Sequence, residues 1–252
     1  RKPTALPFLA GLFMGGAQPV AGATFPAVRF TTATNYNAAL TAFQKDARIR
    51  VLFDNGNSSA GAGVVSAPYE AGFTAFPPTN AKALTMYLGA NGALVSKAPT
   101  TGSASYAPDA TARPSTSAGS SFNAWAAQPN YNWTPLAAGS GLGFISSALS
   151  KNTTVVGPAS LNLSLKSTAT NTDIQVTISE VRPNGDEMYI TSGFLRASYR
   201  TLAKSSTIYA PVPVYTLAAT KLLTPGATTT IRVPINPIAY TFRAGSKIRI
   251  SI

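Results

Sequence analysis

The chain has 252 residues, of which 45% are hydrophobic and only 11% are charged, and it contains no histidine and no cysteine. The absence of histidine removes the commonest general base and metal ligand, and the absence of cysteine removes thiol nucleophiles, zinc clusters and disulfides. A Ser-His-Asp triad cannot be completed within these residues, and no catalytic, metal or cofactor site is predicted. The length is enough for one large β domain with a substantial core.

The charge is strongly basic, with 20 Lys and Arg against 8 Asp and Glu and a formal net charge of +12. Such an excess can attract nucleic acid, anionic lipid or an acidic partner. The basic residues are scattered, however, and no Lys/Arg run or aromatic–basic RNA signature is present, so nucleic-acid binding is not predicted. No apolar run approaches the roughly 18 residues that a membrane span needs.

The composition also bears on the compartment and on the ends of the chain. A cysteine-free, hydroxyl-rich sequence fits a secreted or extracellular bacterial protein, although it does not exclude the cytoplasm. Residues 1–23 imitate a signal peptide, with a basic start, an apolar run and a small-residue exit. We interpret them instead as an internal apolar segment. The final alternating pattern stops at Ile252, so both ends are expected to be cut from a longer protein.

Residues 1–34 are apolar and loop-like, and one helix is predicted after them. Tyr36, Leu40 and Phe43 share a helical face, and Thr34 or Asn35 can cap it. A strand is predicted at 48–53 and a turn at 54–56. Residues 57–80 are predicted to be a loop with aromatic anchors, followed by a strand at 84–88 and a turn at 89–92. Residues 97–143 are predicted to form a long loop that its aromatic residues anchor to the domain.

The second half of the chain alternates between apolar and polar residues, as strands do. The apolar positions are Leu161, Leu163 and Leu165; Ile174, Val176 and Ile178; Ile231, Val233 and Ile235; and Ile248, Ile250 and Ile252. Val181 breaks the parity, which predicts a bulge before a hairpin turn at 183–185 and a return strand at 188–195. Short strands with almost no helix predict a mostly β, antiparallel jelly-roll sandwich.

Several segments of the second half match one family in order. They are Thr172-Asp173-Ile174-Gln175-Val176, Glu180-Val181-Arg182-Pro183-Asn184-Gly185, Gly193-Phe194-Leu195-Arg196-Ala197-Ser198-Tyr199-Arg200 and Phe242-Arg243-Ala244-Gly245-Ser246-Lys247-Ile248-Arg249-Ile250. Together with Tyr87-Leu88-Gly89, they resemble the C-terminal jelly-roll domain of the X-Pro dipeptidyl peptidase and cocaine esterase family of serine hydrolases. The resemblance covers about 48–252.

The resemblance implies a division of the chain and a role for it. Residues 1–47 would be the tail and helix of a preceding α/β-hydrolase domain, and 48–252 a galactose-binding-like jelly roll that is truncated at its C-terminal end. The catalytic triad would lie upstream, outside this chain, and no G-x-S-x-G nucleophile elbow is present. The chain would then be the non-catalytic portion of an enzyme that cleaves ester or X-Pro peptide bonds. It would pack on the hydrolase portion and shape its substrate entrance. A homo-oligomer is also compatible with this role.

Five residues are candidates for that interface or entrance. Asp173 sits in the most recognisable motif, and its alternatives are a polar contact to the hydrolase domain or a carboxylate that binds local backbone N–H groups. Arg196 and Arg200 could bind a carboxylate bidentately or could be exposed strand charges. Trp125 and Trp133 could form an aromatic platform or serve as buried loop anchors.

Three further acidic residues and two rival functions complete the sequence-based interpretation. Asp186 and Glu187 are adjacent and point to opposite strand faces, so they form a poor acid/base pair, and Asp54 reads as a turn residue. The alternatives to a hydrolase part are a stand-alone carbohydrate-binding sandwich, with the aromatic residues of 120–135 as its platform, and a polyanion-adhering protein.

Overall fold

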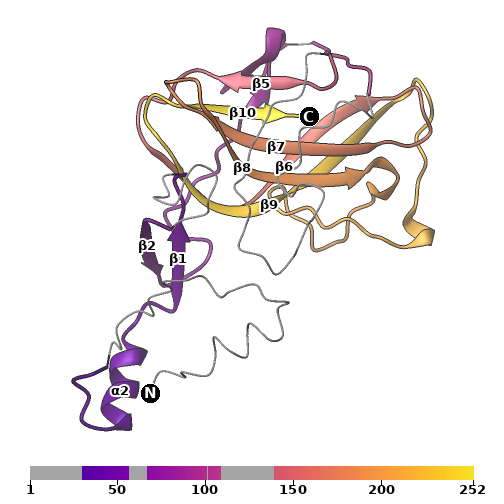
Figure 1. Ribbon diagram of the computed structural model, residues 1–252. Helices are drawn as coiled ribbons and strands as arrows, with labels where there is room; N and C mark the ends of the chain where they lie inside the picture. Colours follow the sequence, from indigo (N-terminus) through magenta and orange to yellow (C-terminus); the bar gives the residue numbers. More distant parts are fainter. Residues whose placement is uncertain (1–29, 57–66, 101, 109–138) are drawn as a thin grey trace, which may run out of the picture.

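The computed structural model describes residues 30–56, 67–100, 102–108 and 139–252, which form a β-sandwich with a projection at one end (Figure 1). One sheet has the strand order β3-β4-β5-β10-β7-β8, and the other is the pair β6-β9. The strands are β3 (Tyr87–Leu88), β4 (Ala93–Val95), β5 (Gly143–Ser146), β6 (Thr153–Lys166), β7 (Asp173–Val181), β8 (Glu187–Arg196), β9 (Thr228–Phe242) and β10 (Lys247–Ser251). All these pairings are antiparallel except β4–β5, which is parallel. The predicted mostly β sandwich is confirmed.

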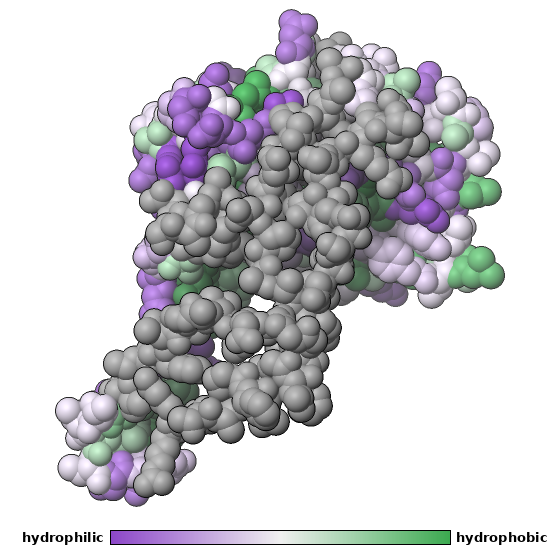
Figure 2. Space-filling view, in the orientation of Figure 1, coloured by the Kyte–Doolittle hydropathy of each residue, from purple (hydrophilic) through white to green (hydrophobic). Residues whose placement is uncertain are grey.

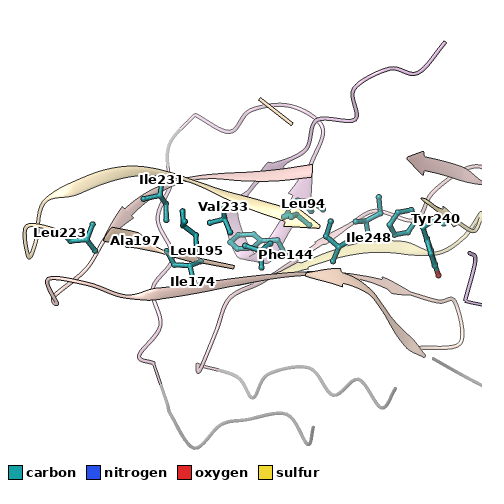
Figure 3. Close-up of a cluster of buried hydrophobic side chains, with 14 residues drawn as sticks. Leu94, Phe144, Ile174, Leu195, Ala197, Leu223, Ile231, Val233, Tyr240 and Ile248 are labelled. Atoms are coloured by element: carbon teal, nitrogen blue, oxygen red, sulfur yellow. The ribbon is translucent and has the colours of Figure 1, made fainter. Parts of the chain in front are cut away.

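The core lies between the two sheets and uses the apolar positions of the alternating pattern (Figure 3). Ile174 and Val176 of β7 and Ile231 and Val233 of β9 are all buried. Burying an aliphatic side chain contributes roughly 1.5–3 kcal/mol. A one-residue slip would turn each such set toward solvent, so the alternation fixes the register of both sheets.

At Gly193 the strands β8 and β9 approach so closely that no side chain fits between them. A Cβ atom on Gly193 would lie 1.9 Å from the carbonyl oxygen of Pro234. Nearby, Thr191 Oγ1 donates a hydrogen bond to the carbonyl oxygen of Asn236 at 3.3 Å. The glycine of the Gly193-Phe194-Leu195-Arg196 motif is therefore required by the closure of the sandwich.

The projection, called the arm below, consists of helix α2 (Tyr36–Gln44) and the antiparallel pair β1 (Ile49–Phe53) and β2 (Tyr69–Phe73). In Figure 1 these elements extend from the sandwich below the end at which β7 finishes. The predicted helix is confirmed, and its Asn35 cap accepts a hydrogen bond from the Ala38 N–H at 2.9 Å. The strand predicted at 48–53 and the turn after it are also present.

The loop predicted over residues 57–80 is wrong where it includes β2. Glu70 and Gly72 have low strand propensity, but tertiary pairing with β1 overrides it. Arg50 Nη2 donates to the Glu70 carboxylate at 2.6 Å, and the Phe53 and Tyr69 rings stack with centroids 5.0 Å apart. A second difference concerns the strand predicted at 84–88, of which only Tyr87–Leu88 is a strand.

The hairpin between β7 and β8 has the predicted turn, but its bulge is elsewhere. Gly185 has φ 91° and donates its N–H to the Arg182 carbonyl at 2.9 Å. The pairing shifts between Ile178 and Ser179, and the extra residue is Ile190 on β8. The predicted bulge at Val181 is therefore wrong, because Glu180 continues the inward-facing set of β7.

Candidate functional site

Strand β7 carries one acidic residue near each end, and the two lie in opposite environments. Asp173 is its first residue and has an exposed side chain, whereas Glu180 is 0% exposed. Seven positions separate them, so strand alternation directs one side chain outward and the other toward the core. Each carboxylate is bound to arginine, but the two groups of contacts differ in nearly every other respect.

The exposed group is a pair between Asp173 and Arg196, which are directly opposite each other on β7 and β8. Arg196 Nε donates to Asp173 Oδ1 at 2.7 Å, and Nη2 donates to Oδ2 at 2.9 Å. This is the planar bidentate geometry that arginine favours with a carboxylate. The hydrogen bonds from Arg196, helped by its positive charge, lower the pKa of Asp173, and the same bonds raise the pKa of Arg196. The side chains are 66% and 55% exposed respectively, so water screens the pair.

This pair borders a shallow depression of about 590 Å³ on the outer surface of β7 and β8. Its other lining includes Gln175 and the aromatic residues Phe194, Tyr199 and Tyr215. The Tyr199 and Tyr215 rings meet edge to face with centroids 5.3 Å apart, while Phe194 and Tyr215 remain exposed. Exposed aromatic rings beside an arginine are a composition typical of protein interfaces and of ligand platforms.

Arg200 has a different use from the one its sequence position suggested. Its guanidinium donates to the carbonyl oxygens of Ala197, Lys221 and Leu222, the first at 3.2 Å and the last at 3.3 Å. These contacts connect the helical turn η2 (Ala197–Tyr199) to the loop that follows η3 (Leu217–Ala219). Arg200 thus holds backbone carbonyls of its own chain, whereas Arg196 holds the carboxylate of Asp173.

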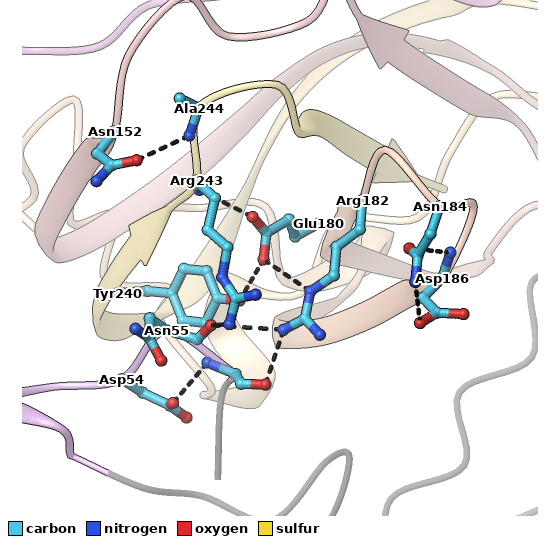
Figure 4. Close-up of polar contacts among 11 residues, drawn as sticks. Asp54, Asn55, Asn152, Glu180, Arg182, Asn184, Asp186, Tyr240, Arg243 and Ala244 are labelled. Carbon is cyan, nitrogen blue, oxygen red and sulfur yellow. Dashed lines mark hydrogen bonds and ion pairs between the residues drawn. The ribbon is translucent and has the colours of Figure 1, made fainter.

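The buried group is centred on Glu180, at the end of β7 nearer the arm (Figure 4). Tyr240 Oη donates to Glu180 Oε2 at 2.7 Å, and the Arg243 backbone N–H donates to Oε1 at 2.9 Å. Arg182 Nε lies 3.8 Å from Oε2, which makes an ion pair. Burial and the hydrogen bond to Glu180 raise the pKa of Tyr240, so this phenol stays a neutral donor.

The two arginines of this group reach the segment at which the arm joins the sandwich. Arg182 Nη2 donates to the Gly56 carbonyl at 2.7 Å, and Arg243 Nη2 donates to the Asn55 carbonyl at 3.0 Å. Asp54 forms a parallel bridge with β9, in which its N–H donates to the Ala239 carbonyl at 3.0 Å. We call Asp54–Gly56 the junction, and the set Glu180, Arg182, Tyr240 and Arg243 the Glu180 cluster.

The remaining sequence candidates have local roles or lie outside the described residues. Asp54 Oδ1 accepts the Gly56 N–H at 2.7 Å, which agrees with a turn residue. Asp186 accepts from Asn184 at 2.7 Å, and Glu187 accepts from Ser179 Oγ at 2.5 Å and from Arg249 at 3.1 Å. Trp125 and Trp133 are not among the described residues.

Sequence reasoning missed the Glu180 cluster. The available signal was the alternation itself, because residues 174, 176 and 178 place position 180 on the core face. A carboxylate at such a position needs partners, since an unpaired buried charge costs several kcal/mol. Its two hydrogen-bond partners, Tyr240 and Arg243, are 60 and 63 positions away, and nothing local in the sequence pairs them with Glu180.

No group of three or more Asp or Glu in the described ranges could hold a metal ion, and no described helix is long and apolar enough to cross a membrane. Without histidine, a serine of this chain has no imidazole base of its own to activate it. Both carboxylates of β7 are bound to arginine and have ordinary structural partners.

Comparison with known proteins identifies the family of the chain. Residues 41–252 match the X-Pro dipeptidyl-peptidase C-terminal non-catalytic domain. No curated protein matches. Similar solved structures include an aminopeptidase from a marine sediment Thaumarchaeota archaeon, at 17% identity and a TM-score of 0.59, covering 82% of this chain and 32% of that one.

Two further structures show the same fold. A CocE/NonD family hydrolase from Staphylococcus aureus is 19% identical with a TM-score of 0.51, covering 73% of this chain and 30% of that one. An alpha-amino acid ester hydrolase is 20% identical with a TM-score of 0.51, covering 66% and 28%. The chain thus spans about a third of the length of these structures.

The described residues form a β-sandwich in which both carboxylates of β7 are bound to arginine. The chain belongs to the family of the X-Pro dipeptidyl-peptidase C-terminal non-catalytic domain. The resemblance found in its motifs is confirmed.

Proposed function

We propose that the chain is the C-terminal portion of a serine hydrolase that cleaves ester or amide bonds, X-Pro peptide bonds among them. It packs on the hydrolase portion of the same protein, through the arm, and shapes the substrate entrance. The family match over residues 41–252 carries this proposal. The hydrolases among the similar structures, each about three times longer than the match, support it.

Helix α2 supports the proposed contact with a hydrolase portion. None of its nine residues is buried, and Tyr36 and Phe43 are exposed. Figure 2 shows apolar residues at the surface of this projection. Isolated helices shorter than about 12–15 residues are marginal in water, so a helix of this length needs a packed face. We infer that its Tyr36, Leu40 and Phe43 face lies against the hydrolase portion, to which residues 1–47 then belong.

The exposed candidates suit a role at the substrate entrance. Asp173 and Arg196 present a charged pair beside the aromatic residues Phe194 and Tyr215, all of them accessible. Arg200 enters this proposal only indirectly, because its guanidinium is bound to carbonyls of its own chain. The role of Trp125 and Trp133 stays a prediction from the sequence.

The test is hydrolysis of p-nitrophenyl acetate and of an X-Pro p-nitroanilide by the natural protein that contains this chain. We expect cleavage of at least one substrate and its loss after treatment with a serine-reactive phosphonate. Phe43→Ser should lower the activity or the thermal unfolding temperature because it removes an apolar contact of α2. Ala42→Ser, on an exposed flank of the same helix, is the matched control.

Two results would contradict the proposal. A natural protein that cleaves neither substrate and takes up no phosphonate is not a serine hydrolase of this kind. A Phe43→Ser variant that matches Ala42→Ser in both activity and unfolding temperature would remove α2 from the interface.

The aromatic depression favours one alternative, a carbohydrate-binding sandwich. Phe194 and Tyr215 could stack on sugar rings, while Asp173, Gln175 and Arg196 could bind hydroxyl groups. Under this alternative Phe194→Ala and Tyr215→Ala abolish binding to immobilised oligosaccharides. Under the hydrolase proposal the wild-type protein shows no such binding to lose.

A further inference from the structure

The Glu180 cluster joins three parts of the chain that are far apart in sequence. Glu180 and Arg182 lie at the end of β7, and Tyr240 and Arg243 lie at the end of β9. The two arginines donate to carbonyl oxygens of the junction. Figure 4 shows both guanidinium groups between Glu180 and this segment. The junction is where the arm meets the sandwich, so these contacts act on the position of the arm.

The geometry leaves little freedom in the junction. Gly56 has φ 62°, and a Cβ atom on it would lie 2.7 Å from Arg182 Nη2 and 3.0 Å from Tyr240 Oη. The backbone of Asp54 is held on both sides by β9, through its own N–H and through its carbonyl, which accepts the Thr241 N–H at 2.9 Å. The junction is therefore held at each of its three residues, Asp54 by the backbone of β9 and Asn55 and Gly56 by the arginines of the cluster.

Stability alone does not account for a charged cluster at this place. The side chain of Glu180 is fully buried and that of Arg182 is only 15% exposed. Removing such charges from water costs about as much as their attraction returns, so well-packed apolar residues could provide similar stability. Arg182 Nε also lacks a hydrogen-bond partner although it is buried. A directed fork of donors does provide what apolar packing cannot, which is a fixed position for two carbonyl oxygens.

We propose that the Glu180 cluster is a clamp that fixes the arm relative to the sandwich. Glu180 is a positioning residue: it orients Arg182 and, through the Arg243 backbone, Arg243, and the two guanidinium groups hold the junction. A role of the arm in carrying the hydrolase portion rests on the proposed function. The clamp itself does not, and its test needs no hydrolysis.

The experiment is hydrogen–deuterium exchange, followed by mass spectrometry, on the natural protein that contains this chain. The double variant Arg182→Lys/Arg243→Lys keeps both positive charges near Glu180 but loses the guanidinium forks. We expect exchange in residues 49–56 to rise at least about tenfold, which is the effect of losing one charge-assisted hydrogen bond, while exchange in β7 and β10 stays unchanged. Arg196→Lys, the same substitution in the exposed pair, is the control and should leave residues 49–56 unaffected.

The single variant Arg243→Lys covers the case in which the double variant does not fold. The Arg243 side chain donates to the Asn55 carbonyl, so this variant leaves the Glu180–Arg182 and Glu180–Tyr240 contacts in place. It should raise exchange in residues 49–56 in the same direction. The proposal is overturned if a folded variant exchanges in that segment within twofold of the wild type, or if Arg196→Lys has the same effect as the cluster variants.

Discussion

The two ends of β7 use the same chemistry, a carboxylate bound to arginine, in different surroundings. At Asp173 the arginine contact is bidentate, with two hydrogen bonds below 3 Å, yet both side chains are more than half exposed. At Glu180 the arginine Nε is 3.8 Å away, yet the carboxylate is fully buried and also accepts hydrogen bonds from Tyr240 and the Arg243 backbone. The Asp173–Arg196 pair thus has the better hydrogen-bond geometry, but it is exposed to solvent, where an ion pair contributes least to stability.

The comparison shows that burial, rather than ion-pair geometry, decides what a carboxylate on this strand does. An exposed pair can be broken at little cost because water replaces the lost partner, so its residues remain free to be used for recognition. A buried carboxylate has no such replacement, and each of its partners becomes structurally necessary. We therefore propose that the Asp173 end serves surface contacts and that the Glu180 end holds the arm.

The largest effect is expected for Glu180→Gln. This variant removes the buried negative charge and leaves the Arg182 guanidinium without its counter-ion. Breaking a buried pair in this way costs about 3–5 kcal/mol of the free energy of unfolding. Urea denaturation followed by circular dichroism checks this value. A loss below about 1 kcal/mol would make the two ends of β7 equivalent and would refute the comparison.

Tyr240→Phe should cost less, about 1.5–3 kcal/mol, because one hydrogen bond to a charged group is lost while Arg182 remains. Its pH dependence is distinctive. The folded protein raises the pKa of Tyr240, so the stability that the hydroxyl contributes is fully present below the unfolded pKa of about 10 and is lost as the pH rises above it. The advantage of the wild type over Tyr240→Phe should shrink by up to about 1.4 kcal/mol per pH unit there. An advantage that stays constant to pH 11 would show that Tyr240 ionises freely in the folded state.

Asp173→Asn should have a small effect, below about 1 kcal/mol at neutral pH, since the pair is exposed. Its folded pKa is lowered, so the stability it contributes is present above the unfolded value of about 3.9 and is lost as the pH falls through the folded pKa. Wild type and Asp173→Asn should therefore converge in strong acid. Urea midpoints at pH 7 and pH 2 measure both differences, and a gap that widens on acidification would contradict this sign.

The smallest effect is expected for Arg196→Met on stability at high salt. Screening weakens an exposed pair, so the difference between wild type and variant should approach zero at 1 M NaCl. The Glu180 variants, in contrast, should keep most of their loss at that salt concentration because the cluster is buried. A salt-insensitive Arg196→Met loss would mean that Arg196 is needed for packing as well as for charge.

Much of the fold could be predicted from local patterns, and the arm and cluster show where those patterns end. Alternation identified β7 and the core positions of β9, and Asn35 before an apolar helical face identified α2. Strand β2 was missed because Glu70 and Gly72 are poor strand formers. They adopt strand conformation because they pair with β1. The sequence motif around Gly193 was recognised, but its reason, the contact with the Pro234 carbonyl, needs the structure.

The candidate site divides in the same way. Asp173 and Arg196 were each noticed, but nothing local indicates that they bind one another across β7 and β8. Glu180 was missed because its partners Tyr240 and Arg243 are 60 and 63 residues away. For Arg200 the sequence left open a carboxylate contact or an exposed strand charge, and the structure shows neither. The loop that brings the Lys221 and Leu222 carbonyls to it is not visible in the sequence.

We propose that this chain supplies packing and position while the chemistry lies elsewhere in the protein. The most direct measurement is to label the natural protein with a serine-reactive phosphonate and to identify the labelled peptide by mass spectrometry. We predict a single modified serine outside residues 41–252, with loss of ester hydrolysis in proportion to labelling. A modified serine within residues 41–252, with the same proportional loss, would contradict the account.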